Sequence, residues 1–332
     1  MKVLVSGASG AIGRFLIPQL VEAGHDVVGM TRRQDKADAL SELGARGVIV
    51  DALDRQAVRR VVLDAEPEAV IDELTSLPPD YDLRNPRLYD ANDEVRSKGT
   101  TALHDAAREA GARRFIMQSV AFLYAPEGDW VKTEDARPWL DAPMPFRRGI
   151  KVLHDNEQRV TGDPDVEGVA LRYGFFYGPG TYYAPDGSIA AQVRKRQFPI
   201  VGKGRGMTSY VHLYDAAGAT VAALERGRGI YNIVDDEPAP LREWVPVYAR
   251  AIGAKRPLRI PAWLARMFAG GAIASMATAL RGASNAKARS ELGWQPVLPT
   301  WREGFVTALD RAPLGEQRSV GPLGEGGAPD VS

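Results

Sequence analysis

The sequence predicts an α/β fold: a doubly wound parallel sheet of the Rossmann type, with a smaller mixed C-terminal substrate lobe. Two observations support this fold class. Short apolar runs alternate with helical patterns through the first half of the 332-residue chain, which is typical of a parallel sheet covered by helices on both faces. The first run is followed directly by a glycine-rich turn and an apolar-periodic helix, the context that a dinucleotide-phosphate site needs.

Six apolar runs are the expected strands of the first domain, which we place at residues 1–173. They are Val3–Ser6, Asp26–Thr31, Gly47–Val50, Ala69–Ile71, Arg114–Gln118 and Gly168–Tyr173. Helical patterns lie between most of them. From about residue 174 this alternation ends, and short strands mix with helices.

Residues 174–312 are therefore expected to form a substrate-binding lobe that is discontinuous and shares elements with the first domain. Its long apolar segment, Ile260–Leu280, is interrupted by Arg266 and by a Gly-Gly pair, which favours a packed helix over a membrane span. The tail at residues 313–332 is rich in glycine and proline and lacks apolar periodicity, so we expect it to be disordered.

The turn after the first strand is the expected phosphate site. Its glycines allow a tight turn and let the backbone approach a pyrophosphate, whose negative charge is favoured by the start of the following helix. The expected cofactor contacts in this turn are Gly7, Ser9, Gly10, Ala11, Ile12 and Gly13.

The end of the second strand predicts the kind of dinucleotide. NAD-preferring sites usually carry an acidic residue there, whereas this chain has Thr31 followed by Arg32 and Arg33. Because an arginine can hold a 2′-phosphate through two hydrogen bonds, we expect NADP(H), with NAD(H) as the alternative. Further cofactor contacts are expected at Asp51, Ala52, Leu74, Tyr173 and Phe175.

Composition excludes several classes of function. Lys plus Arg and Asp plus Glu are both 42, and there is no basic tract, so a nucleic-acid partner is not expected. The absence of cysteine excludes disulfides, thiolate metal sites and a cysteine nucleophile, and we identify no metal site. The chain begins in a core strand without a charged-then-apolar leader, so we expect a cytoplasmic protein with no membrane association.

The chain up to about residue 310 resembles the extended short-chain dehydrogenase/reductase family, of the NAD-dependent epimerase/dehydratase type. The motifs that carry the resemblance are GASGAIG (7–13), SKGTTALHDAAREAGARRFIMQS (97–119), LRYGFFYGPG (171–180), SYVHLYDAAGA (209–219), GIYNIVDDEP (229–238) and SNAKARSELGWQP (284–296). The resemblance implies a cofactor in the N-terminal domain and a small-molecule substrate in the cleft between the lobes. It also implies a catalytic Ser or Thr after the fifth strand, then a Tyr and a Lys four residues apart on the next helix.

This catalytic pattern is not present here. Matching Tyr124 to the family's usual aromatic residue puts Val120 at the position of the catalytic hydroxyl, with Ser119 one residue earlier. The lost groups need replacements if proton transfer is to occur. The candidates that we select are Ser119, Tyr124 and Lys151.

The helix that should carry the Tyr–Lys pair can be aligned in two ways. Matching Glu157 to the family's glutamate puts Gly149 and Leu153 at the Tyr and Lys positions. Matching Lys151 instead puts Arg147 at the tyrosine position. Neither alignment restores the pair.

The substrate region departs from the nucleotide-sugar members as well. Phe175 and Thr208 occupy positions where those members usually carry an Asn and an Arg that contact the diphosphate, so we expect nucleotide sugars not to be substrates. Aromatic side chains instead predict a pocket for a small, largely apolar molecule. The expected substrate contacts are Phe175, Phe176, Tyr177 and Tyr182, and the proline-rich segment 125–146 is the expected binding loop or lid.

These observations favour an NADP(H)-dependent oxidoreductase that acts on a carbonyl, alcohol or enone of a small, largely apolar molecule. Two alternatives stay open. One is an epimerase, dehydratase or cyclase that uses the cofactor transiently or structurally, and the other is a catalytically silent NADP(H)-sensing protein. The expected partner is a small-molecule substrate, and assembly as a homodimer is left open.

Overall fold

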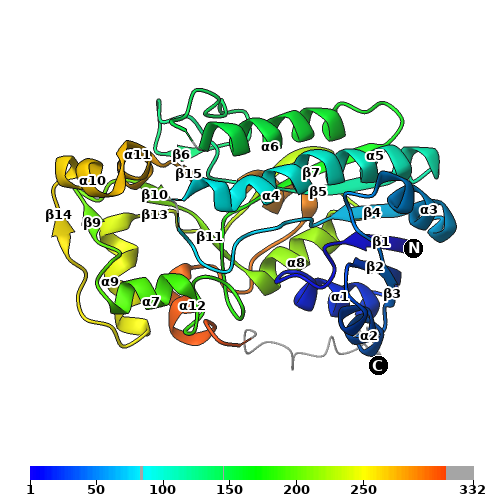
Figure 1. Ribbon diagram of the computed structural model, residues 1–332, viewed down its shortest axis with the longest axis horizontal. Coiled ribbons are helices and arrows are strands. Elements are labelled where there is room, and N and C mark those ends of the chain that lie inside the picture. Colours follow the sequence, from blue (N-terminus) through cyan, green and yellow to red (C-terminus); the bar gives the residue numbers. More distant parts are fainter. Residues whose placement is uncertain (83–84, 145, 312–332) are drawn as a thin grey trace, which may run out of the picture.

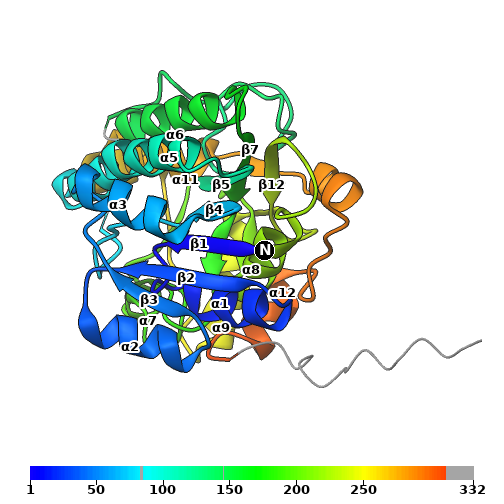
Figure 2. The same cartoon turned by 90° about the vertical axis from the view of Figure 1, so that its right-hand side faces the viewer.

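Seven parallel strands form the central sheet of the computed structural model (Figure 1), in the order β12-β7-β5-β4-β1-β2-β3, all labelled in Figure 2. The structure describes residues 1–82, 85–144 and 146–311. The strands are β1 (Lys2–Ser6), β2 (Asp26–Thr31), β3 (Arg46–Ile49), β4 (Ala69–Asp72), β5 (Arg114–Val120), β7 (Glu167–Tyr173) and β12 (Gly229–Ile233). The predicted fold class is confirmed, and all six predicted strands are present. Strand order reverses between β1 and β4, which opens a crevice at the carboxyl edge of the sheet.

Helices cover both faces of this sheet (Figure 2). One face carries α1 (Gly13–Glu22), α2 (Gln34–Glu42) and α8 (Leu213–Ala222), and the other carries α3 (Arg55–Ala65), α5 (Thr100–Glu109) and α6 (Phe146–Thr161). Side chains alternate along each strand. Val3 and Val5 therefore pack toward Leu16 and Leu20 of α1, while Leu4 joins the core that contains Leu103 of α5.

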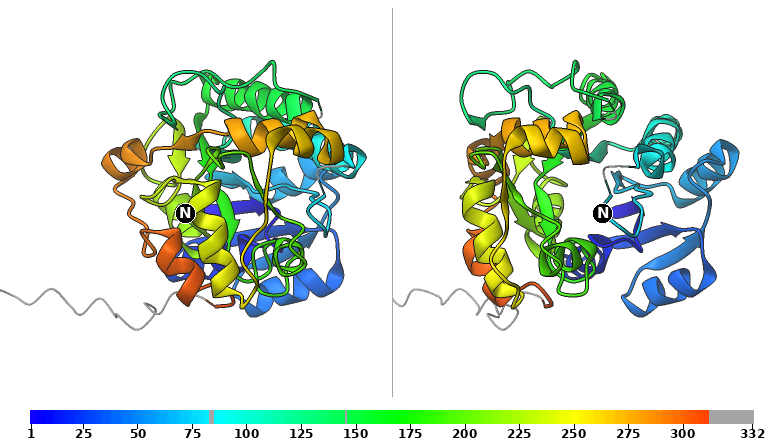
Figure 3. Two further views of the ribbon diagram at one scale, coloured as in Figure 1. Left: turned by 90° about the vertical axis from the view of Figure 1, so that its left-hand side faces the viewer. Right: turned by 60° about the vertical axis from the view of Figure 1, so that its left-hand side comes forward.

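A smaller lobe lies beside the carboxyl edge of the sheet (Figure 3). Its helices are α7 (Ser188–Arg194), α9 (Leu241–Ala251), α10 (Ala262–Ala269), α11 (Gly271–Ala279) and α12 (Trp301–Thr307). Its short strands are β8 (Phe175–Tyr177), β9 (Ile200–Val201), β10 (Met207–Thr208), β11 (Tyr210–His212), β13 (Ala239–Pro240), β14 (Arg259–Ile260) and β15 (Gly282–Ala283), of which β15 pairs with β6 (Val131–Lys132). Tyr210, Trp244 and Phe305 form the centre of its aromatic core.

The chain crosses between the two parts more than once. Both α8 and β12 come from the segment expected in the lobe, yet α8 packs against α1 and β12 pairs with β7 as the edge strand of the main sheet. The side chains of Tyr231 and Ile233 in β12 are fully buried there. Burial of these apolar residues explains why this segment extends the first domain.

The single packed helix expected over residues 260–280 is wrong. The segment forms two short helices, α10 and α11, because Gly270 adopts a φ of 92° that ends the first helix. Trp263 and Phe268 of α10 are 65% and 76% exposed. No helix among the described residues is long and apolar enough to cross a membrane. The predicted disordered tail, residues 313–332, lies outside the described residues.

A buried ion pair joins α6 to the sheet. Arg172 of β7 donates from Nε to Oε1 of Glu157 at 2.7 Å and from Nη2 to Oε2 at 2.6 Å. Ser119 of β5 donates its hydroxyl to the same carboxylate at 2.6 Å, and Arg172 also donates to the hydroxyl of Tyr124 at 3.0 Å. Both charges are removed from water, so each depends on the other for compensation.

Replacing either member of this pair should destabilise the fold. We expect Arg172→Met or Glu157→Leu to lower the free energy of unfolding by about 3–5 kcal/mol, because each leaves one buried charge without a partner. The double variant should lose less free energy of unfolding than the sum of the losses in the two single variants. Urea unfolding of the three variants and the wild type measures these losses. Lys151→Met is the matched control on the same helix: it breaks an exposed pair with Asp155 and should change stability by less than about 1 kcal/mol. Additive losses would contradict the prediction.

Candidate active site

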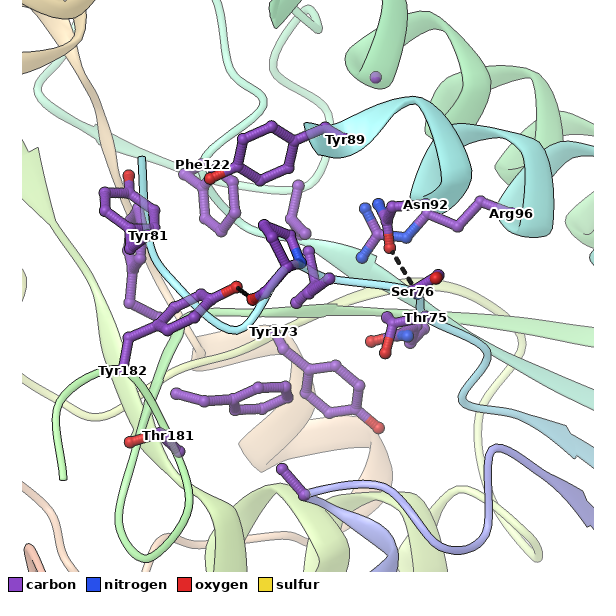
Figure 4. Close-up of a pocket in the computed structure, with 18 of the residues that line it drawn as sticks. Thr75, Ser76, Tyr81, Tyr89, Asn92, Arg96, Phe122, Tyr173, Thr181 and Tyr182 are labelled. Atoms are coloured by element: carbon purple, nitrogen blue, oxygen red, sulfur yellow. Dashed lines mark hydrogen bonds between the residues drawn. The ribbon is translucent and has the colours of Figure 1, made fainter. Parts of the chain in front are cut away.

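A cavity of about 1180 Å³ opens at the carboxyl edge of the sheet (Figure 4). Its wall includes residues 10–12 after β1, Glu73 after β4, residues 118–120 at the end of β5, and Tyr173 at the end of β7. The smaller lobe supplies the far side, including Met276 of α11. The cavity therefore lies at the reversal of strand order, where α/β sheets of this kind bind their ligands.

The glycine-rich turn forms a cradle beside this cavity. Gly7 has a φ of 69°, and a side chain there would place its Cβ 2.3 Å from the carbonyl oxygen of Glu73. A Cβ on Gly13 would lie 1.9 Å from the carbonyl oxygen of Ala8. Helix α1 has no side-chain cap at its N-terminus, so its first amides are available to an anion. The backbone of residues 10–12 thus fits a dinucleotide phosphate.

Of the two arginines after β2, Arg32 lines the cavity and Arg33 does not. Arg33 instead forms an exposed ion pair with Asp35 at 2.7 Å. Arg32 makes no ion pair with another described residue. Ser9, another predicted cofactor contact, shares a hydrogen bond of 3.2 Å with the hydroxyl of Thr31, which places the turn next to the end of β2.

Three further predicted cofactor contacts lie outside the cavity wall. The carboxylate of Asp51 accepts a hydrogen bond from the amide of Leu53 at 3.0 Å. Ala52 and Leu74 pack around Gly99, where a Cβ would lie 3.5 Å and 3.1 Å from their side chains. Tyr173 and Phe175, by contrast, both line the cavity.

The positions matched to the family's catalytic residues do face the cavity. Val120, Gly149 and Leu153 all line it, which supports the alignment based on Glu157. None of the three can transfer a proton. Lys151, two residues from Gly149 and Leu153, points away from the cavity because two residues turn a helical side chain by about 200°. It is exposed and pairs with Asp155 at 2.8 Å.

The other two predicted catalytic residues are held by the buried network described above. Ser119 lines the cavity, but its hydroxyl hydrogen is donated to Glu157. Tyr124 is only 1% exposed, does not line the cavity, and donates its hydroxyl to Asn232 at 2.6 Å. Burial raises the pKa of Tyr124 to about 12. Of the predicted catalytic residues, the structure therefore places only Ser119 in the cavity wall.

Sequence reasoning missed Glu73, which lines the cavity directly after β4. Its carboxyl accepts a hydrogen bond from the Tyr173 hydroxyl at 2.9 Å through Oε1, while Oε2 has no partner among the described residues. Burial raises the pKa of Glu73 to about 8. The side chain is thus a largely neutral acid at pH 7. The signal in the sequence was an acidic residue immediately after a buried strand.

Aromatic side chains form much of the wall, as expected. Phe122 stacks on Phe175 with ring centroids 4.3 Å apart and 21° between the planes. The rings of Tyr81 and Tyr182 pack together on the neighbouring wall with their centroids 5.4 Å apart, close to Phe122 in Figure 4. Phe176 also lines the cavity. These aromatic rings can pack against the faces of a flat apolar ligand.

One expected substrate contact and the proline-rich segment 125–146 differ in where the structure places them. Tyr177 does not line the cavity: it is fully buried against His212 and Phe305, with ring centroids 5.1 Å and 5.3 Å away. The segment 125–146 does reach the cavity through Trp139. Trp130 of the same segment instead packs against Arg281, whose guanidinium carbon lies 4.0 Å from the centroid of the Trp130 ring.

The fold and the phosphate cradle define a Rossmann-type NAD(P)-binding enzyme. The chain belongs to the NAD dependent epimerase/dehydratase family, whose model matches residues 3–234. The family assignment made from the motifs is therefore confirmed.

Relatives and solved structures agree with this family. The chain is 42% identical over 309 residues to a "3-diazoavenalumate denitrifying reductase" of a Streptomyces species, covering 92% of this chain and 99% of that protein. It is 28% identical to a 2-alkyl-3-oxoalkanoate reductase of Stenotrophomonas maltophilia, covering 77% of each. The crystal structure of a Thermotoga maritima UDP-glucose 4-epimerase with UDP-glucose superimposes with a TM-score of 0.72 at 20% identity, covering 92% of this chain and 96% of that one.

The raised pKa of Glu73 predicts a pH-dependent stability. An unfolded glutamate releases its proton near pH 4.5, whereas folded Glu73 keeps it to about pH 8. Between these values the folded state binds the extra proton, so its contribution to stability is full below pH 4.5 and is lost as the pH rises. Relative to Glu73→Gln, the wild-type free energy of unfolding should fall by up to about 1.4 kcal/mol per pH unit. Urea unfolding of both proteins at pH 5, 6, 7 and 8 measures this, and parallel pH profiles would refute it.

Proposed function

We propose that this protein is an NADPH-dependent reductase that replaces the diazo group of a small aromatic compound by hydrogen. One observation carries the proposal: the cavity positions of the family's Tyr–Lys pair are occupied by Gly149 and Leu153. The relative that is 42% identical supports the diazo group by its name. The stacked pair of Phe122 and Phe175 supports an aromatic substrate.

The missing Tyr–Lys pair fits a reduction that needs no acid. Reducing a ketone creates an alkoxide, which the family's tyrosine would protonate. When bound, the reduced nicotinamide supplies a hydride that forms a C–H bond at the ring carbon, while the C–N bond breaks and its electron pair leaves with N₂. An arenediazonium ion then becomes an arene, the cofactor is oxidised, and no proton is consumed.

The residues of the cavity would act by position and by excluding water. Val120 and Leu153 place apolar groups where the family has polar ones, so they shield the reacting carbon from water. Phe122 and Phe175 orient the ring by stacking. The turn at residues 10–12 holds the cofactor phosphates, and Arg32 holds the 2′-phosphate.

A second candidate is the reduction of a ketone or enone, with Glu73 as the acid. The observation that favours it is the unpartnered Oε2 of this largely neutral carboxyl in the cavity wall. A proton on this oxygen would be available to a developing alkoxide. The reductase of Stenotrophomonas maltophilia supports this reading by its name.

The two candidates predict different behaviour of the same variant. With 4-carboxybenzenediazonium and NADPH, we expect one N₂ released per NADPH oxidised, and deuterium from C4-labelled NADPH should appear on the ring carbon. Glu73→Gln and Ser119→Ala should keep rates within about threefold of wild type, because no proton transfer is needed. Reactions without enzyme are the blank.

The protein should not bind UDP-glucose in a calorimetric titration, because Phe175 and Thr208 occupy the positions of the diphosphate-binding residues.

Turnover of aromatic ketones but not of the diazonium ion would overturn the first candidate. If Glu73→Gln then lost roughly 10²–10⁴-fold in turnover, Glu73 would be the acid of the second candidate.

Cofactor preference is the remaining prediction. Wild-type protein should bind NADPH more tightly than NADH, and Arg32→Ala should lose about 1.5–3 kcal/mol of NADPH affinity, the value of a hydrogen bond to a charged group. Arg33→Ala is the matched control and should lose much less, since Arg33 is already paired with Asp35. Fluorescence titration with both cofactors measures this. Equal affinities for NADPH and NADH in the wild type would contradict it.

A further inference from the structure

Arg96 presents to the cavity a guanidinium that has no ion-pair partner among the described residues. Four of the arginines that the structure describes line it: Arg32, Arg87, Arg96 and Arg148. Arg148 pairs with Asp90 at 2.9 Å and with Asp93 at 3.4 Å, and Arg87 is exposed. Arg96 differs from both, because its Nε is enclosed by protein yet has no hydrogen-bond partner among the described residues.

The neighbouring carboxyl groups Asp72, Glu73 and Asp93 lie close enough to act on Arg96 electrostatically, but none of them forms an ion pair with it. No guanidinium nitrogen of Arg96 forms an ion pair or a hydrogen bond with another described residue. Asp72 already accepts hydrogen bonds from Ser6 at 2.9 Å and from Thr100 at 2.6 Å. Asp93 is paired with Arg148, and Glu73 is largely protonated at pH 7 because burial raises its pKa to about 8.

The backbone holds Arg96 in this place. It lies in a π-helical turn, η2 (Val95–Gly99), which follows the 3₁₀ turn η1 (Pro86–Tyr89) and α4 (Asp90–Glu94). The side-chain amide of Asn156 on α6 donates to the carbonyl oxygen of Arg96 at 2.6 Å. Figure 4 shows the Arg96 side chain beside Asn92 and Ser76, which are joined by a hydrogen bond of 3.0 Å. Single π-helical turns inside helices are frequent at functional sites.

Arg96 is half-buried, and the enclosure of its Nε without a partner costs free energy that a ligand of opposite charge at its two terminal nitrogens would offset. The cofactor phosphates have their own cradle at the start of α1, so the anion at Arg96 belongs to the other ligand. A carboxylate suits the planar guanidinium, which can donate two parallel hydrogen bonds to it. The ring that carries this carboxylate would lie against Phe122 and Phe175.

We propose that Arg96 binds the carboxylate of an aromatic acid and thereby selects aromatic carboxylates as the substrates of this enzyme. The inference rests on the proposed reductase function and narrows its substrate class. It assigns Arg96 to binding and orientation, with no part in hydride transfer.

The test is the binding of unreactive probes to the NADP⁺-loaded full chain, measured by calorimetry. Wild-type protein should bind cinnamate, and should bind cinnamamide about 10- to 150-fold more weakly, the range expected for a hydrogen bond to a charged group. Arg96→Met should bind cinnamate as weakly as the amide, and Arg96→Lys should fall between them. Arg87→Met, the matched control at another arginine of the cavity wall, should bind both probes like wild type. Equal NADP⁺ affinity and melting temperature in all variants show that folding and cofactor binding are intact.

Several results would overturn the assignment. They are an absence of cinnamate binding to wild type, equal binding of acid and amide, a loss of acid binding in Arg87→Met but not in Arg96→Met, or a loss of NADP⁺ affinity in Arg96→Met. The proposed function fails separately. If the acids bind through Arg96 but 4-carboxybenzenediazonium is not reduced, the reductase proposal is wrong and the carboxylate site remains. If Arg96→Met reduces the diazonium ion with an unchanged KM, the carboxylate site is wrong and the reductase proposal remains.

Discussion

The buried pair of Arg172 and Glu157 determines how the wall of the active site is built. Glu157 ties α6 to β7, and Ser119 ties the end of β5 to the same carboxylate. With α6 fixed at this point, Leu153 and Gly149 face the cavity one and two turns before Glu157, and Lys151 faces solvent. The orientation of one helix therefore decides which side chains can take part in chemistry.

The same helix supports the charged part of the cavity. Asn156, next to Glu157, holds the backbone of the π-helical turn that carries Arg96. Arg96 and Glu73 thus lie in the wall of the same cavity, one as an unpaired cation and the other as a largely neutral acid. Their states are linked, because a carboxyl that stays protonated leaves the guanidinium charge for a ligand. Burial disfavours the charged form and so explains the neutral state of Glu73, whereas Arg96 keeps its charge because a guanidinium stays protonated in proteins.

The fold of the epimerase/dehydratase family is thus retained while its proton-transfer groups are not. The strand order, the glycine cradle and the position of the cavity agree with the family. The cavity wall differs, since apolar residues and glycine stand at the three catalytic positions. Because strand order and loop cradle are backbone properties, they tolerate a complete change of the side chains that carry out the chemistry.

Local sequence alone determined the fold class and the phosphate cradle. An apolar strand, a glycine turn and a periodic helix are adjacent along the chain, and Gly7 and Gly13 lie where a Cβ would collide with backbone atoms. The loss of the Tyr–Lys pair was also visible, since neither alignment of the helix restored it. These features depend on neighbours in sequence.

Only the tertiary structure decided which candidate residues reach the cavity. The sequence allowed two registers for α6, and the ion pair with Arg172, 15 positions further along the chain, selects one of them. Tyr124 follows the fifth strand, where the sequence predicts a catalytic group, but its hydroxyl donates to Asn232, 108 positions away. Glu73 and Arg96 could not be distinguished from ordinary charged residues, because their burial and partners depend on segments that are distant in the sequence. Desolvation and long-range hydrogen bonding, which local patterns do not encode, give this site its chemistry.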